Sequence, residues 1–230
     1  MPSSTAPKQD YPGLQYQPDS KQHGKMFGAA RKFLRAQFGQ PTGIVGKMTG
    51  WIMAKSVSNQ ERSDWTLSLL DIQPTDRILE IGFGPGLAVE IAAKLAPKGF
   101  IGGVDHSDVM VGHASKRNAA AVAEGRVVLR QGSASQLPKW DKPFDKIFTI
   151  NSIHFWEDPV ASLRELRGML RAGGTMAVTL QPRSREAEQG SEEKIARELM
   201  VKLEAAGYKD CRFELCRTDN VTAACVIGKN

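Results

Sequence analysis

Cysteine is scarce in this 230-residue sequence, which contains only Cys211, Cys216 and Cys225. The odd number argues against a disulfide framework, and the three residues include no Cys-x-x-Cys pair. No histidine follows them, so they lack the spacing of a zinc site. We therefore expect the three thiols to be small buried side chains, and we expect no metal site in the chain.

Long hydrophobic runs are absent as well. No window approaches the about 18 consecutive apolar residues that a membrane-spanning helix needs, and residues 1–20 lack the apolar core of a secretion signal. The composition, with 41% hydrophobic and 24% charged residues, is that of a globular domain with a sizeable core. These features predict a cytoplasmic protein without a membrane span.

A net positive charge is missing from most of the chain, although the total net charge is +6. The first fifty residues hold seven lysines and arginines against two aspartates, a net charge of +5. Residues 51–230 therefore contribute only +1. A nucleic-acid-binding domain normally carries a concentrated basic surface, so this distribution disfavours nucleic acid as a partner of the main domain.

The first 58 residues differ in composition from the rest. Residues 1–24 contain four prolines among polar residues and are predicted to be a flexible segment. Residues 25–38 place apolar side chains at helical spacing with basic ones between them, which predicts an amphipathic helix. We expect residues 25–58 to form a helical cap or lid, or to join two copies as a homodimer; a membrane-surface anchor is less favoured. The main domain then spans residues 59–230.

Short β-branched runs alternate with helical patterns along that domain, which predicts a doubly wound parallel sheet. After a helix at residues 59–70, strands are predicted at residues 77–81, 100–105, 126–131, 145–150, 175–180, 211–216 and 222–227. Helices are predicted at residues 86–95, 108–124, 159–170 and 191–206.

The most informative stretch is residues 78–86, where an apolar strand runs into Gly82, Gly84 and Gly86 and then into a helix. Glycines let backbone amides approach a ligand closely, and the helix N-terminus favours electron-rich groups. The nicotinamide fingerprint G-x-G-x-x-G would need glycine at position 87, which is Leu87. The spacing therefore disfavours NAD.

Asp105 ends the second predicted strand, and the glycine loop has no lysine that would grip a phosphate. The carboxylate is placed to accept hydrogen bonds from both ribose hydroxyls of an adenosine-like ligand. A simple helix-capping role for Asp105 is less favoured, because Ser107 or Asp108 can cap the following helix.

These residues resemble the class I S-adenosylmethionine-dependent methyltransferases, and in particular the small-molecule branch that includes quinone-biosynthesis methyltransferases. The resemblance covers roughly residues 60–181. It rests on five ordered motifs: Glu80–Gly86, Val104–Ser107, Gly132–Pro138, Phe144–Asn151 and Leu170–Thr175. It implies an α/β fold, a Rossmann-like doubly wound seven-stranded mostly parallel sheet with helices on both faces and N-terminal helices as a cap. It also implies S-adenosylmethionine as cofactor and S-adenosylhomocysteine as product.

The resemblance assigns the cofactor site residue by residue. The implied contacts are Glu80, Gly82, Phe83, Gly84, Gly86, Asp105, His106, Ser133, Ala134 and Asn151. The family usually has aspartate where this chain has Ser133, and that aspartate accepts a hydrogen bond from the adenine amino group. The departure puts the detail of adenine recognition in question.

Methyl transfer requires a site that aligns the acceptor, excludes water and disperses positive charge. Aromatic faces suit this purpose, and the fourth strand is followed by His154, Phe155 and Trp156. His154 is a candidate catalytic base, and its alternative role is packing or hydrogen bonding. The expected substrate pocket comprises Met48, Trp51, Arg62, His154 and Trp156.

Three alternatives to a small-molecule methyltransferase stay open. A nucleic-acid methyltransferase lacks support, since Asn151-Ser-Ile-His stands where many amino-methylating enzymes have Asn/Asp-Pro-Pro-aromatic. A non-catalytic cofactor-binding partner protein would have no physical reason to retain both the glycine motif and Asp105. A nicotinamide dehydrogenase is disfavoured by Leu87.

Overall fold

The computed structural model describes residues 57–182, 191–218 and 221–230. The chain divides into two units, Met1–Ile52 and Met53–Asn230, and the described residues all belong to the second. The predicted flexible segment and nearly all of the predicted helical cap therefore lie outside the described residues.

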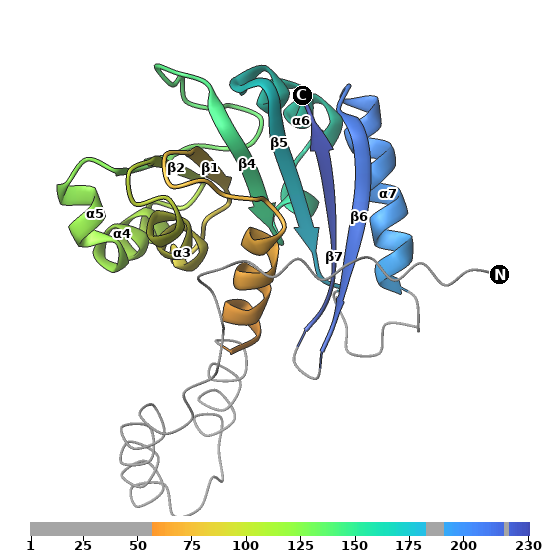
Figure 1. The fold of residues 1–230 in the computed structure, drawn as a ribbon, viewed down its shortest axis with the longest axis horizontal. Helices are drawn as coiled ribbons and strands as arrows, with labels where there is room; N and C mark the ends of the chain where they lie inside the picture. Colours follow the sequence, from red (N-terminus) through yellow and green to blue (C-terminus); the bar gives the residue numbers. More distant parts are fainter. Residues whose placement is uncertain (1–56, 183–190, 219–220) are drawn as a thin grey trace, which may run out of the picture. The chain divides into compact units, whose positions relative to one another are not determined.

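A seven-stranded sheet with the strand order β3-β2-β1-β4-β5-β7-β6 organises the second unit (Figure 1). All neighbouring strands are parallel except β7, which runs antiparallel to β5 and β6. The strands are β1 Arg77–Ile81, β2 Phe100–Asp105, β3 Val127–Gln131, β4 Phe144–Ile150, β5 Leu170–Leu180, β6 Lys209–Arg217 and β7 Thr222–Lys229. The predicted seven-stranded, mostly parallel sheet is confirmed.

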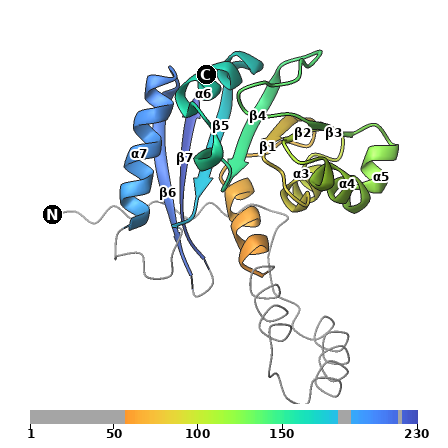
Figure 2. The ribbon, with the colours of Figure 1, turned by 180° about the vertical axis from the view of Figure 1, so that it is seen from behind.

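Helices cover both faces of this sheet, because the central strands are apolar on both sides (Figures 1 and 2). Side chains from α6 and α7 join one buried cluster, and side chains from residues 57–68, α3 and α4 join the other. The labelled helices are α3 Leu87–Leu95, α4 Asp108–Arg117, α5 Ala119–Ala123, the short 3-10 helix η1 Ile153–Phe155, α6 Pro159–Met169 and α7 Ser191–Ala205.

The single helix predicted at residues 108–124 is wrong, since the structure has two helices separated at Asn118. The buried Asn118 amide donates to the carbonyl oxygens of Ala114, at 2.9 Å, and Gly86, at 3.1 Å. The bond to Gly86 links the end of α4 to the glycine loop. Asparagine side chains compete with the helical backbone for hydrogen bonds, which favours a break here.

Two further expectations need correction. β5 begins at Leu170, five residues before the predicted start, because Leu170 pairs with Phe144 before an irregularity in the β4–β5 register. Of the three cysteines only Cys225 is buried. Cys211 and Cys216 are half-buried because they lie on β6, an edge strand with one unpaired side.

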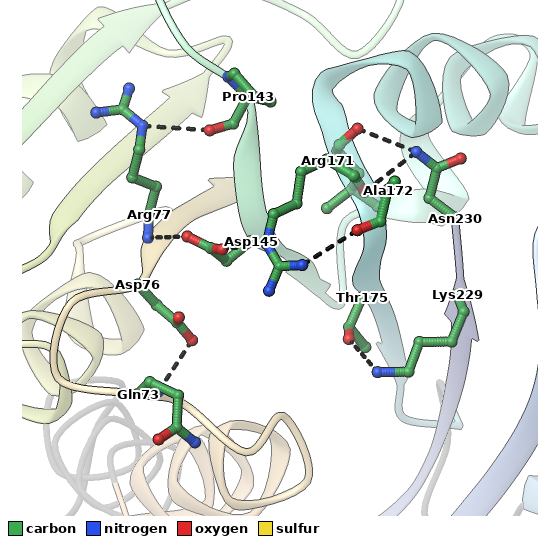
Figure 3. A network of polar contacts seen from close by, with 11 residues as sticks. Gln73, Asp76, Arg77, Pro143, Asp145, Arg171, Ala172, Thr175, Lys229 and Asn230 are labelled. Carbon is green, nitrogen blue, oxygen red and sulfur yellow. Dashed lines mark hydrogen bonds and ion pairs between the residues drawn. The ribbon is translucent and has the colours of Figure 1, made fainter.

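A polar network ties the strands together at the edge where the parallel strands begin (Figure 3). Asp145 accepts a hydrogen bond from the backbone N–H of Arg77 at 2.8 Å and pairs with Arg171. The Lys229 ammonium donates to the Thr175 hydroxyl at 2.9 Å. This network, called the amino-edge network below, joins β1, β4, β5 and β7.

Candidate active site

The turn after β1 is built on left-handed backbone. Gly82, Gly84 and Gly86 have φ values of 78°, 51° and 78°. A Cβ atom on Gly82 would lie 2.3 Å from the Ser152 Oγ, so only glycine lets the turn pack against the loop after β4. A Cβ on Gly84 would meet no atom within 4 Å, so open space faces this position.

Asp105 joins this turn to the end of β2. Its Oδ2 accepts from the backbone N–H of Gly84 at 2.8 Å, and its Oδ1 accepts from that of Ser107 at 3.0 Å. Ser107 caps α4 through the N–H of Met110, so Asp105 does not serve as that cap. Each carboxylate oxygen keeps a further lone pair for a ligand, since an ionised carboxylate has about four acceptor sites.

A cavity of about 600 Å³ opens beyond the carboxyl ends of β1, β2 and β4. Ligands of α/β sheets bind at this edge, and the volume suits a drug-sized molecule. The lining residues are Ile81, Gly82, Val104, Asp105, His106, Gly132, Ser133, Ala134, Ser135, Asn151, Ser152, Phe155, Trp156 and Glu157. They include two carboxylates, but the lining drawn from the described residues includes no lysine or arginine.

The structure brings seven of the fifteen predicted site residues together at this cavity. These seven line it: Gly82, Asp105, His106, Ser133, Ala134, Asn151 and Trp156. Six others are described but are not among the lining residues: Arg62, Glu80, Phe83, Gly84, Gly86 and His154. The remaining two, Met48 and Trp51, lie outside the described residues.

Glu80 lies in β1 behind the glycine turn and is only 3% exposed. Burial, and second the nearby charge of Asp105, raise the pKa of Glu80 to about 8. Its Oε2 has no hydrogen-bond partner among the described residues. The carboxyl group is therefore mostly protonated at neutral pH, and a nearby positive charge would favour its ionisation.

The loop after β3 forms a second wall. Ser133 pairs with Gln136 in an isolated bridge, and its hydroxyl lies 3.0 Å from that of Ser135. The N–H of Gly132 donates to the Asp105 carbonyl at 2.9 Å, which fixes the loop beside the end of β2. Hydroxyls and backbone amides of this loop can recognise the polar edge of a base.

The loop after β4 forms the third wall. Asn151 has a left-handed φ of 55°, and its Oδ1 accepts from the backbone N–H of Gln181 at 2.9 Å. The Ser152 hydroxyl accepts from the Trp156 indole N–H at 3.0 Å. These bonds fix the loop to the end of β5 and hold the indole beside η1.

An exposed aromatic side chain lies on this third wall. Phe155 lines the cavity although it is 77% exposed, and its ring centroid lies 3.9 Å from that of the half-buried His154. The sequence indicates Phe155 only as one of the aromatic residues after the fourth strand. Glu157 is not predicted, and its only sequence signal is its position after that strand.

Arg62 lies on the helix formed by residues 57–68, which Figures 1 and 2 show in orange beside the carboxyl ends of β4 and β5. Its guanidinium donates to side-chain oxygens of Ser58, Asn59 and Gln181. Since Gln181 also donates its backbone N–H to Asn151, Arg62 is one residue removed from the cavity wall.

Among the described residues, no cluster of three or more His, Cys, Asp or Glu side chains has a geometry that would hold a metal ion. In the same part of the chain, no helix is both long and apolar enough to cross a membrane.

Comparisons with known proteins agree with this geometry. A family model described as a methyltransferase domain matches residues 78–174. The uncharacterized methyltransferase YdaC of Bacillus subtilis is 30% identical over 182 residues, which are 79% of this chain and 97% of the relative. The chain belongs to the class I S-adenosylmethionine-dependent methyltransferases.

A second relative and a solved structure are also similar to this methyltransferase. The ubiquinone/menaquinone biosynthesis C-methyltransferase UbiE of Geotalea daltonii is 31% identical over 106 residues, 46% of this chain and 45% of the relative. A solved structure of a possible histamine N-methyltransferase from Thermotoga maritima aligns with a TM-score of 0.60 over 81% of this chain and 95% of that one, at 22% identity. That likeness shows the shared fold.

The cofactor of this methyltransferase is S-adenosylmethionine, and the residues present fit it. Three features fit this cofactor. Open space faces Gly84, the Asp105 carboxylate lies at the cavity wall, and the loop after β3 presents hydroxyl groups. A nucleoside with two ribose hydroxyls and a polar base matches this set of acceptors and donors.

Proposed function

We propose that this methyltransferase transfers the methyl group of S-adenosylmethionine to a small-molecule acceptor. The observation that carries the proposal is the cavity of about 600 Å³, whose lining includes Asp105 and Glu157 but no lysine or arginine from the described residues. A polynucleotide acceptor would need cations for its phosphates. A partly aromatic cavity of this size suits a small acceptor instead.

In this proposal the glycine turn and the two neighbouring loops hold the cofactor. Asp105 accepts hydrogen bonds from the ribose hydroxyls while it keeps the Gly84 and Ser107 amides in place. Ser133 and Ala134 contact the adenine, and His106, whose ring is largely exposed, flanks the adenosine. Gly82 and Asn151 also line the cavity and are proposed to contact the methionine portion.

The bound cofactor supplies an electrophilic methyl group on a sulfonium centre. The chain's own task is then to orient the acceptor and to exclude water from the reacting atoms. Phe155 and Trp156 offer aromatic faces that attract positive charge, and Glu157 adds a carboxylate beside them. Glu80, buried behind the turn, is more readily ionised when a cation lies nearby.

His154 is proposed as the base that accepts a proton from the acceptor. The centroid of its ring lies 3.9 Å from that of Phe155, which lines the cavity, so a molecule held against Phe155 would lie close to His154. A base contributes about 100-fold or more to turnover, so His154→Gln should lower kcat by that order and leave cofactor affinity unchanged. An unchanged kcat would make His154 a packing residue.

Several relatives bear names that support a small acceptor. They include methyltransferases named for rifamycin, erythromycin and trans-aconitate substrates. The similarity to each of these three covers only 40–42% of the relative's length. Their names therefore support the class of acceptor and not its identity.

The test begins with calorimetric titration of the full chain with S-adenosylmethionine and S-adenosylhomocysteine, with NADH as control. Micromolar binding of the first two without NADH binding is expected. Amines, thiols and phenols are then screened for methyl transfer, with duplex DNA and RNA in parallel. Transfer only to nucleic acid, with a steep loss at raised salt, would overturn the proposal. Binding without transfer to any acceptor would favour a non-catalytic partner protein.

A further inference from the structure

Arg62 is a buried cation whose partners are all neutral. The residue is 4% exposed, and its guanidinium donates to Ser58 at 3.5 Å and to the side-chain oxygens of Asn59 and Gln181. Among the described residues no carboxylate forms an ion pair with it. Burial lowers the pKa of Arg62, because the charged form loses its hydration. A buried charge normally has a counter-ion, so this site lacks an anion.

The nearest acidic residues on the same helix are directed to other partners. Asp64 accepts from the Gln60 amide at 3.0 Å. Glu61 accepts from the Thr218 hydroxyl at 3.5 Å, on the side of the helix that faces the end of β6. The absence of a counter-ion at Arg62 is thus not a general shortage of acids in this region.

The guanidinium also has unused donors. It carries five N–H groups, of which Nη1 uses two, for Ser58 and Gln181, and Nη2 uses one, for Asn59. The Nε–H is buried and has no hydrogen-bond partner in the described structure. One hydrogen on Nη2 is also left. Two remaining donors on one planar group match the two oxygens of a carboxylate.

The position of Arg62 relative to the cavity is fixed by hydrogen bonds. Gln181, which accepts from Arg62, follows directly after β5 and donates its backbone N–H to the Asn151 side chain at 2.9 Å. Asn151 lines the cavity. A buried hydrogen bond of 2.8 Å between the hydroxyls of Thr66 and Thr179 also links the helix of residues 57–68 to β5.

We propose that Arg62, with Asn59 and Gln181, forms a subsite that binds a carboxylate group of the methyl acceptor. The inference rests on the proposed function, because it takes the acceptor to be a small molecule held next to the cofactor cavity. It adds the chemical class of that molecule, a carboxylic acid whose anion supplies the counter-ion of Arg62.

A carboxylate suits the subsite better than a phosphate. The single positive charge of Arg62 balances one negative charge, and its hydrogen-bond partners Ser58, Asn59 and Gln181 are neutral. A phosphate monoester carries a charge between −1.5 and −2 at neutral pH. It would leave excess negative charge in a buried site.

The test measures anion binding to the full chain saturated with S-adenosylhomocysteine. Sodium acetate, benzoate and succinate are titrated at constant ionic strength against sodium chloride, with sodium phosphate as a separate arm, and the melting temperature is recorded. A saturable rise with a carboxylate is expected for the wild type, and a weaker one for Arg62→Lys, which keeps the charge but lacks the planar pair of donors. Arg62→Gln should weaken it at least tenfold. Arg164→Gln, which removes an exposed arginine, is the matched control and should behave as the wild type.

A second variant keeps the proposal testable if Arg62→Gln does not fold. Asn59→Asp places a carboxylate beside the guanidinium, so it should raise the melting temperature without added anion and abolish the response to carboxylates. Three results would overturn the proposal. They are a wild-type melting temperature that shows no saturable rise with any carboxylate, an equal rise in Arg62→Gln, or a rise with phosphate alone. A chain that fails to bind S-adenosylhomocysteine would instead contradict the proposed function, so the two failures are distinguishable.

Acceptor turnover gives an independent readout. Phenols and amines are compared in matched pairs that carry either a carboxylate or a carboxamide. The wild type should prefer the carboxylate member at least tenfold in kcat/KM, and Arg62→Gln should erase this preference while its affinity for S-adenosylhomocysteine stays unchanged. Equal loss of both members would mean that Arg62 only holds the loop, and would overturn the subsite.

Discussion

The two edges of the sheet differ in how their charged side chains are paired. At the amino edge, Asp145 accepts from a backbone N–H and from Arg171, and Lys229 donates to Thr175 (Figure 3). At the carboxyl edge, Glu80 and Arg62 each keep a buried polar atom without a partner in the described structure. One edge satisfies its charges within the chain, whereas the other leaves groups for a ligand to satisfy.

Left-handed backbone occurs at both edges and does not separate them. Gly82 and Asn151 follow β1 and β4 at the carboxyl edge and line the cavity, whereas Gly125 precedes β3 and Gly173 lies near the start of β5 at the amino edge. The edges differ in how their charged groups are paired. This difference indicates that stability and ligand binding depend on opposite ends of the same strands, so substitutions at the two edges should have separable effects.

The largest effect is expected for Asp105→Ala at the carboxyl edge. The substitution removes the proposed partner of both ribose hydroxyls and the acceptor of the Gly84 amide. Loss of charge-assisted hydrogen bonds should weaken S-adenosylhomocysteine binding by about 2 to 3 kcal/mol. Calorimetric titration of the folded variant measures it, and an unchanged affinity would contradict the ribose assignment.

A pH effect follows from Glu80. Its pKa is about 8 in the folded chain, against an ordinary value of 4.5, so folding takes up a proton between these values. The free energy of unfolding of the cofactor-free protein should therefore fall as pH rises from about 5 to 8, by at most about 1.4 kcal/mol per pH unit. Urea unfolding at several pH values measures this slope. Glu80→Gln should flatten it, and equal slopes in both proteins would show that Glu80 is not its source.

At the amino edge, Asp145→Ala should cost stability without affecting the cofactor. The variant leaves the Arg77 backbone N–H and Arg171 without their acceptor, which corresponds to about 1 to 2 kcal/mol for a partly exposed site. Urea unfolding should detect the loss while S-adenosylhomocysteine affinity stays at the wild-type value. A parallel loss of affinity would break the separation of the two edges.

The smallest effect is expected for Asp141→Asn. Asp141 forms an ion pair with Arg77 at 3.0 Å, but its side chain is 70% exposed. Exposed pairs contribute little, so the free energy of unfolding should change by less than about 0.5 kcal/mol. Asp141→Asn, measured by urea unfolding, is the matched control for Asp145→Ala. If both variants lost a similar free energy of unfolding, the exposure of a contact would not predict its contribution to stability.

The sequence predicted the parts of the molecule that are local in the chain. The bounds of β1 and β2 follow from apolar runs that end at the glycine motif and at Asp105. The cofactor side of the site follows from the same two stretches, because the glycines and the carboxylate lie directly after their strands. These features depend on periodicity and on special backbone, both of which single residues reveal.

The remaining features depend on contacts between distant residues. The break at Asn118 depends on a carbonyl at Gly86, 32 positions earlier in the chain. The neutral partners of Arg62 include Gln181, and the cavity wall at Phe155 depends on how the loop after β4 turns. Spacing along the chain carries no signal for such neighbours, so the sequence could name Arg62 and Trp156 as pocket residues but not the contacts that they make.

The long-range tie between Arg62 and Gln181 also bears on the order of folding. The two residues are 119 positions apart, and closing so long a loop is entropically unfavourable until other contacts hold its ends near each other. We expect β1, β4 and β5 to pair before this bond forms. We therefore expect the part of the cavity around Asp105 to form first, and the contact between Arg62 and Gln181 to form last.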